Sequence, residues 1–124
     1  MRKTPLISLK KKGDFKRVFN RRKSAAGPLF VVYAAANDLG FYRLGISVSK
    51  KVGYAVVRSR VKRLVRESCR HLLFEKNFSE NDGQAFDLII IARAPVGNLP
   101  REGSFAKVNG SLVQLFGRLG VLTK

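Results

Sequence analysis

The sequence is poor in the residues that build disulfides, zinc sites and nucleophile–base pairs. Its 124 residues include one cysteine, Cys69, and one histidine, His71. A lone cysteine forms no intrachain disulfide, and these two side chains are too few soft ligands for a structural metal. They also point to divergent sides of a predicted helix, so they make no catalytic pair. We expect Cys69 to be a partly buried structural thiol.

Acidic residues and long apolar runs are also scarce. The eight Asp and Glu residues show no paired spacing for acid–base or metal chemistry. The longest apolar run covers the eight residues 29–36, against the ~20 needed to cross a bilayer, and no apolar segment follows Arg2 and Lys3 as in a secretion signal. No phosphate-binding G-x-x-x-x-G-K-[ST] pattern occurs. We therefore expect a cytoplasmic protein without membrane, NTPase or metal chemistry and without catalytic residues of its own.

Positive charge is what the sequence has in excess. The chain carries 25 Lys and Arg against 8 Asp and Glu, a net charge of +17. Residues 1–70 hold 19 of the basic residues and only three acidic ones, whereas the remaining 54 hold six basic and five acidic residues. A charge of this size attracts polyanions. Its confinement to one part of the chain predicts a nucleic-acid contact region, the alternative being a set of solvated lysines and arginines.

Length and pattern predict one α+β domain over residues 1–124. The expected elements are a helix over 11–21, strands over 29–36 and 42–49, a long helix over 55–74, a strand over 86–92 and a helix over 104–118. This α-β-β-α-β-α order describes a two-layer α/β sandwich. The first two strands are expected to pair as an antiparallel hairpin, and residues 1–9 and 119–124 to be mobile until bound.

Two of these elements have predicted faces. Alternation in the second strand turns one set of side chains toward the core and leaves a small polar set on the other face. The core-facing set is Tyr42, Leu44, Ile46 and Val48, and the opposite set is Arg43, Gly45, Ser47 and Ser49. The last helix is expected to close the core with Phe105, Val108, Leu112, Leu115 and Phe116.

The long helix combines an apolar stripe with a row of cations. Its stripe consists of Val57, Val61, Leu64, Val65, Ser68 and Leu72, and its row of Arg58, Lys62, Arg66 and Arg70 at steps of four, widened by Arg60 and Arg63. Like charges at this spacing repel one another, and the phosphates of a nucleic acid neutralise them. A merely solvated face normally interleaves Glu, and only Glu67 is present. Lys50 and Lys51, just before the helix, extend the predicted phosphate-binding region.

Three aromatic residues have two possible roles. Phe15 and Phe19 lie four positions apart on the first helix, and Tyr33 lies on the first strand. Helical spacing of aromatics is typical of core packing. Exposed rings, in contrast, stack unpaired bases of a single strand. Periodicity alone favours the core for the two phenylalanines and leaves Tyr33 open.

One segment makes the sequence recognisable. Residues 43–67, RLGISVSKKVGYAVVRSRVKRLVRE, closely resemble the signature of the bacterial ribonuclease P protein subunit. The resemblance covers about residues 8–117, taken as the domain core. The family's Arg-Asn-Arg box corresponds to Arg58-Ser59-Arg60, and Tyr54 stands where the family has asparagine. The two arginine roles are therefore expected to persist without the amide contacts. A structural ribosomal RNA-binding protein is the alternative function, and a nuclease acting alone is a third.

The resemblance implies a noncatalytic subunit that assists an RNA enzyme. The RNA, with Mg²⁺ bound mainly by that RNA, removes the 5′ leader of precursor tRNA, and no membrane or obligate protein partner is implied. The implied fold is that of the second domain of ribosomal protein S5, with a left-handed β-α-β crossover. Residues implied to bind the catalytic RNA are Lys50, Lys51, Arg58, Arg60, Lys62, Arg63, Arg66 and Arg70. Those implied to line a cleft for the single-stranded leader are Phe15, Phe19, Tyr33, Ser47 and Ser49.

Overall fold

The computed structural model describes residues 7–21, 23–75 and 85–121. The elements in chain order are β1 (Ile7–Ser8), α1 (Lys12–Asn20), β2 (Ser24–Ala26), β3 (Phe30–Asn37), β4 (Arg43–Ser47), α2 (Ala55–Arg70), the π-helical turn η1 (His71–Glu75), β5 (Ala85–Ala92), the 3-10 helix η3 (Ala94–Asn98) and α3 (Ser104–Arg118). The six predicted elements are all present. Two short strands, β1 and β2, were not predicted.

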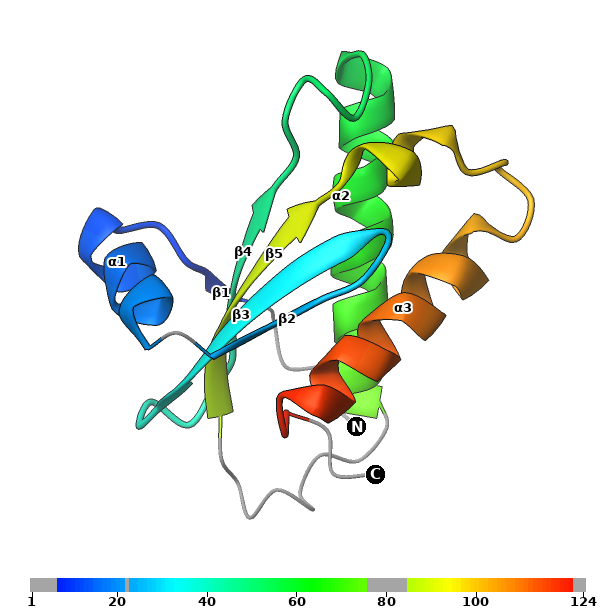
Figure 1. Ribbon diagram of the computed structural model, residues 1–124. Helices are drawn as coiled ribbons and strands as arrows, with labels where there is room; N and C mark the ends of the chain where they lie inside the picture. The colour runs from blue at the N-terminus through cyan, green and yellow to red at the C-terminus, as the bar shows by residue number, and fades with distance from the viewer. Residues whose placement is uncertain (1–6, 22, 76–84, 122–124) are drawn as a thin grey trace.

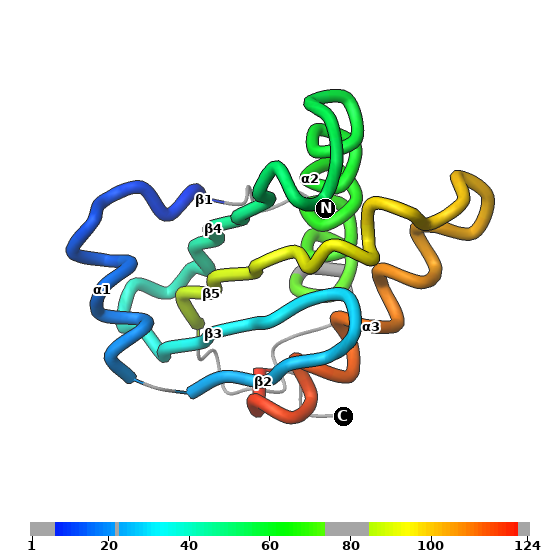
Figure 2. The backbone as a smooth tube through the Cα atoms, turned by 45° about the horizontal axis from the view of Figure 1, so that its top comes forward, coloured from blue at the N-terminus to red at the C-terminus, as the bar shows by residue number. Residues whose placement is uncertain are grey.

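The strands form one five-stranded sheet in the order β1-β4-β5-β3-β2. β5 is the central strand, parallel to β4 and antiparallel to β3. All but one of its residues are buried, as expected of an apolar strand covered on both faces. The two outer strands lie beside β4 and β3 in Figure 2.

The predicted hairpin of the first two strands is wrong. β3 and β4 both pair with β5, which lies between them. β4 and β5 are parallel, so the chain between them crosses over through α2, as the family resemblance implies. The hairpin prediction assumed that strands close in sequence pair with each other. Here the apolar β5 gains cover on both edges by inserting between them.

α2 and α3 cover one face of the sheet and form the predicted sandwich with it (Figure 1). The predicted stripe is buried there from Val61 of α2 to Leu72 of η1, with Val57 partly buried. Val108, Leu112, Leu115 and Phe116 of α3 are buried beside it. The buried hydroxyl of Ser68 donates to Asn109 Oδ1 at 2.7 Å and links the two helices. Phe105 is the exception to the predicted core: it is 37% exposed and meets the ring of His71 edge-on.

α1 lies alone on the opposite face (Figures 1 and 2). It packs a small cluster in which Leu9, Val18, Ala35 and Ile89 are buried and Phe15, Tyr33 and Ile91 are partly buried. The helix covers only part of this face, since Val31 and Ile91 are only partly buried and Ser47, in register with them, is exposed. This incomplete cover leaves part of the sheet open beside α1.

The ordered core extends beyond the predicted residues 8–117. Ile7 and Ser8 pair with β4, and Leu9 is buried. Leu119 and Val121 are buried at the other end. Residues 7–8 therefore pair with the sheet, and Leu9, Leu119 and Val121 pack into the domain, while the mobility of the two ends before binding stays a prediction. Residues 1–6 and 122–124 lie outside the described part of the chain.

Candidate nucleic-acid interface

The cations of α2 spread around the helix instead of forming one row. At about 100° per residue, Lys62 and Arg60 are about 160° apart, with Arg66 and Arg63 between them. Lys62, Arg63 and Arg66 are exposed, and Arg58, Arg60 and Arg70 are partly exposed. This spread gives α2 two different basic sides, one toward α1 and one away from it.

The side toward α1 belongs to a groove of about 220 Å³. The groove is lined by Phe15 of α1, by Leu44 and Gly45 of β4 and by Lys62 and Arg66 of α2. The rest of its lining consists of Ile7, Ser8, Leu9 and Ile46. We call this the leader groove, after the cleft for a single-stranded leader that the family resemblance implies. Two predicted RNA-binding cations and one predicted cleft aromatic thus share one space.

Close packing on Gly45 positions the ring of Phe15 in the leader groove. A Cβ added to Gly45 would lie 2.8 Å from Phe15 Cε1, closer than real Cβ contacts. The ring therefore lies against the bare backbone of β4. The small face predicted for this strand is used to seat an aromatic ring.

Phe19 and Tyr33 form a second aromatic feature on the same face of the sheet. Their ring centroids are 4.8 Å apart at an interplanar angle of 79°. Phe19 is 39% exposed, and Tyr33 is half-buried. Tyr33 packs at the edge of the cluster beneath α1, whereas Phe19 belongs to neither core cluster, so the prediction from periodicity alone is wrong for Phe19. Exposed aromatic faces at this position can stack bases.

The predicted serines lie on the open part of the same face. Ser47 is exposed at the end of β4, in register with Ile91 of β5, which is in register with Val31 of β3. Ser49 follows β4, and its hydroxyl accepts a hydrogen bond from the backbone N–H of Lys51 at 3.3 Å. Lys50 and Lys51 are exposed in this turn. These residues and the Phe19–Tyr33 pair lie outside the leader groove's lining.

A buried carboxylate fixes α1 on the sheet. Asp87 of β5 is fully buried; Arg43 donates to it through Nε at 2.8 Å and Nη2 at 2.7 Å. Arg17 of α1 also pairs with Asp87, and Asn37 donates to it at 2.8 Å. Arg43 in turn pairs with Asp14 of α1 at 3.1 Å. We call these five residues the anchor.

The anchor keeps Asp87 ionised. Burial acts to raise the pKa of Asp87, but the hydrogen bonds from Arg43, Asn37 and Arg17 outweigh burial and hold this pKa below its usual value. The bond to Asp87 likewise raises the pKa of Arg43. Sequence reasoning missed this group. The signal was a single charge, Asp87, inside the apolar run of residues 86–92.

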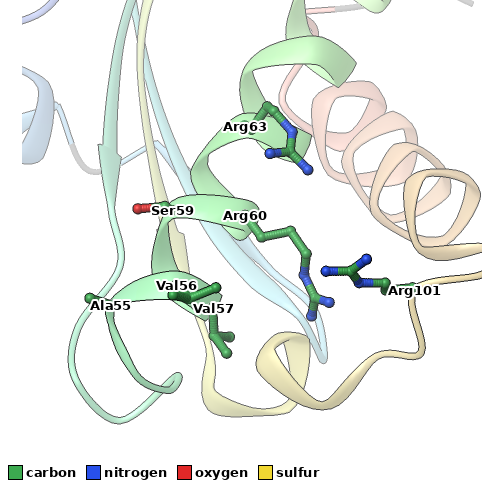
Figure 3. A pocket seen from close by; sticks show the side chains of 7 residues that line it. All are labelled: Ala55, Val56, Val57, Ser59, Arg60, Arg63 and Arg101. Carbon is green, nitrogen blue, oxygen red and sulfur yellow. The ribbon is translucent and has the colours of Figure 1, made fainter.

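The other basic side of α2 borders a second cavity, of about 380 Å³ (Figure 3). Arg60 and Arg63 of α2 line it together with Arg101, which lies between η3 and α3, and with Ala55, Val56, Val57 and Ser59. The side chains of Arg60 and Arg101 point toward one another, and Ser59 points to the opposite side of α2. Arg101 was not among the predicted site residues.

Arg58, the other arginine of the box, is partly committed to its own backbone. Its Nε donates to the carbonyl of Gly53 at 3.1 Å, which ties the first turn of α2 to the preceding loop. Its remaining guanidinium donors have no partner among the residues that the structure describes. Arg70 is the last residue of α2, about one turn beyond Arg66, and it lines neither cavity.

Three further observations concern metal binding, the thiol of Cys69 and membrane insertion. No three His, Cys, Asp or Glu side chains gather in the described ranges as a metal-binding set. Cys69 is fully buried, more deeply than the partly buried thiol that was predicted, and burial raises its thiol pKa. No helix of the described part of the chain is long and apolar enough to span a bilayer.

Known proteins match the chain over nearly its whole length. The family model described as Ribonuclease P matches residues 5–120. The ribonuclease P protein component of Clostridium botulinum (strain Langeland) is 37% identical over 113 residues, which are 91% of this chain and 94% of that protein. The component of Exiguobacterium sibiricum is 42% identical over 114 residues, 91% of this chain and 90% of that protein.

Solved structures agree with the sequence matches. The ribonuclease P protein of Staphylococcus aureus superposes with a TM-score of 0.77 at 34% identity, covering 95% of this chain and 99% of that one. The protein of Thermotoga maritima gives a TM-score of 0.68 at 30% identity, covering 90% and 96%. The chain therefore belongs to the ribonuclease P protein family, and as such it is a component of an endoribonuclease complex and a partner of the ribonuclease P RNA.

Proposed function

We propose that this protein binds the catalytic RNA of ribonuclease P and the 5′ leader of precursor tRNA, and thereby assists Mg²⁺-dependent removal of the leader. The observation that carries the proposal is the leader groove, where the ring of Phe15 lies beside the cations of Lys62 and Arg66. A single-stranded nucleic acid offers both base faces and phosphates. A groove with both kinds of partner suits such a strand.

The leader is assigned to the α1 side of the sheet. There the exposed Phe19 and the half-buried Tyr33 continue the aromatic surface beyond Phe15, and the exposed Ser47 and Ser49 offer hydroxyl donors. Stacking is worth ~1 to 3 kcal/mol per base and tolerates any sequence. Binding of this kind favours precursor over mature tRNA, because only the precursor carries a leader.

The catalytic RNA is assigned to the remaining cations. The phosphate contacts come from Lys50, Lys51, Arg58, Arg60, Arg63 and Arg70. Lys62 and Arg66, at the edge of the leader groove, contact both the leader and the catalytic RNA. Neutralising RNA phosphates releases counterions, so this binding weakens steeply with salt. Bond cleavage belongs to the RNA, which also binds the catalytic Mg²⁺.

Reconstitution tests the proposal. The purified protein, incubated with precursor tRNA and Mg²⁺, is expected to leave the RNA intact, and addition of a bacterial ribonuclease P RNA is expected to give accurate 5′ processing faster than that RNA alone at the same salt. Cleavage by the protein alone, or no gain over RNA alone, would contradict it. Precursors with leaders of zero to eight nucleotides then show whether the affinity of the holoenzyme rises with leader length.

A further inference from the structure

The cavity at the start of α2 brings three arginines together with no carboxylate to neutralise them. Arg60, Arg63 and Arg101 line it, and none has an ion-pair partner within residues 7–21, 23–75 and 85–121. Arg60 Nε is buried and has no hydrogen-bond partner among the described residues. A buried donor left unpaired is costly and calls for an acceptor.

The geometry favours an anion that accepts from several sides. Arg60 and Arg101 point toward one another from separate elements (Figure 3), so a group between them meets guanidiniums from two directions. The first turn of α2 borders the cavity, and no side chain caps its N-terminus, so the helix adds a positive end. A tetrahedral phosphate offers acceptors in matching directions, and guanidinium forks bind it bidentately.

Hydrogen bonds fix the backbone at Arg101. Ser104 donates to the Arg101 carbonyl through its hydroxyl at 2.9 Å and its N–H at 3.3 Å, and Gly103 between them adopts φ 82°. The turn thereby fixes the start of α3 and the origin of the Arg101 side chain. The side chain itself is exposed and free to accommodate a ligand.

We propose that Arg60, Arg63 and Arg101 form a binding site for one backbone phosphate of the ribonuclease P RNA, with Arg101 an RNA-binding residue supplied by the C-terminal part of the chain. The assignment to this RNA and not to the leader follows from position, because Arg60 lies about 160° around α2 from Lys62 of the leader groove. The proposal rests on the proposed function for the identity of the RNA and on the cavity alone for the phosphate.

Affinity for a bacterial ribonuclease P RNA transcript, measured across a KCl series, tests the site. Arg101→Ala is expected to weaken binding about tenfold, as for a lost charge-assisted hydrogen bond, and to lower the salt slope by about one. Arg101→Lys keeps the positive charge but not the planar guanidinium, and its affinity for the RNA is expected to lie between those of the wild type and Arg101→Ala. Lys107→Ala is the control, because it removes one charge from an exposed position on α3. Its affinity for the RNA is expected to stay within about twofold of the wild-type value. If Arg101→Ala behaves like Lys107→Ala, the site is wrong.

A double-mutant cycle tests whether the arginines share one phosphate. Arg60→Ala with Arg101→Ala is expected to lose less affinity than the product of the two single losses, because either change alone disrupts the site. Strictly multiplicative losses would overturn the shared phosphate. If the variants lost only their preference for precursor over mature tRNA and kept full affinity for the ribonuclease P RNA, the phosphate would belong to the leader. That result would overturn the assignment.

A measurement on the protein alone separates this proposal from the proposed function. Inorganic phosphate titrated into the wild-type protein is expected to shift the Nε–H NMR resonances of Arg60 and Arg101, and the shift of Arg60 is expected to weaken in Arg101→Ala. Failure of the protein to assist a ribonuclease P RNA would refute the proposed function while leaving this titration informative. Unshifted Arg60 and Arg101 resonances would refute the phosphate site even in an active holoenzyme.

Discussion

The two faces of the sheet hold their helices by different means. α2 and α3 lie on an almost wholly apolar core, which holds Phe30, Leu72, Phe116 and most other large buried side chains. α1 lies on a cluster with only four buried apolar residues and is fixed by the charged anchor around Asp87. The comparison teaches that most of the apolar core lies on one face and the proposed substrate surface on the other. Damage to the core is therefore expected to affect the whole molecule, whereas damage to the anchor is expected to affect the α1 face most.

Breaking the apolar face should have the largest effect. Phe116→Ala removes a fully buried ring and is expected to cost about 3–5 kcal/mol of unfolding free energy, measured by urea denaturation. All RNA binding is expected to weaken with it as the folded fraction falls. Val113→Ala changes a 39% exposed side chain of the same helix and should cost less than about 1 kcal/mol. Equal losses for the two variants would contradict this account of the core.

Breaking the anchor should affect the other face. Asp87→Asn leaves Arg17 and Arg43 without their carboxylate and is expected to cost about 3 kcal/mol, near the low end for a buried pair because both arginines are partly exposed. Amide exchange should accelerate in α1 more than in α3, and preference for precursor over mature tRNA should fall. Asp38→Asn, in an exposed turn, makes the same charge change as a control. Unaltered exchange in α1 would show that the anchor does not hold it.

Acid should weaken the anchor progressively. The folded pKa of Asp87 lies below the unfolded value of about 3.9, so its contribution is fully present above that value and is lost as pH falls through the folded pKa. The difference in unfolding free energy between wild type and Asp87→Asn is therefore expected to shrink from pH 5 toward pH 2. Because both proteins share the other titrating groups, this difference isolates Asp87. If the difference in unfolding free energy grew as the pH fell, the pKa of Asp87 would be raised by folding and not lowered, which would contradict this prediction.

The smallest change sharpens the comparison at a single contact. Gly45→Ala places a methyl group against the Phe15 ring and is expected to cost about 1 kcal/mol, because the half-buried ring can shift. The shift should reduce leader-dependent affinity severalfold without altering affinity for the catalytic RNA. Gly110→Ala, on α3 with open space at its Cβ, is expected to match or slightly exceed wild-type stability. Leader binding that survives in Gly45→Ala would remove Phe15 from the proposed site.

Local pattern predicted the helices and long strands because each carries its own periodicity. The stripe of α2 and the alternation of β4 are properties of neighbouring residues. Burial confirms the stripe from Val61 onward, and it confirms the core side of β4 at Leu44 and Ile46. The other side of β4 is not open throughout, because Phe15 covers Gly45. Strand order is a property of the whole chain, and the hairpin prediction failed because nothing local in β3 or β4 specifies β5 as their common neighbour. β1 and β2, of two and three residues, are too short to show a period.

The site was predictable to the extent that its residues are close in sequence. The cations of α2 and the spacing of Phe15 and Phe19 could be read directly from the chain. Their division into two basic sides could not, because it depends on where α1 and Arg101 fall around α2. Asp87 shows the same limit: its partners Arg17 and Arg43 lie 70 and 44 positions away.

The central place of β5 has a consequence for synthesis of the chain. This strand joins β4 to β3, yet it is the last strand to be translated. A nascent chain that stops before Ala85 holds 19 basic residues in its first 70 positions but has no strand to connect its two half-sheets. We expect such a chain to stay unfolded as a polycation next to ribosomal RNA, because its two half-sheets have no common neighbour. The sheet is completed only by residues 85–92, which carry one acidic side chain and no basic one.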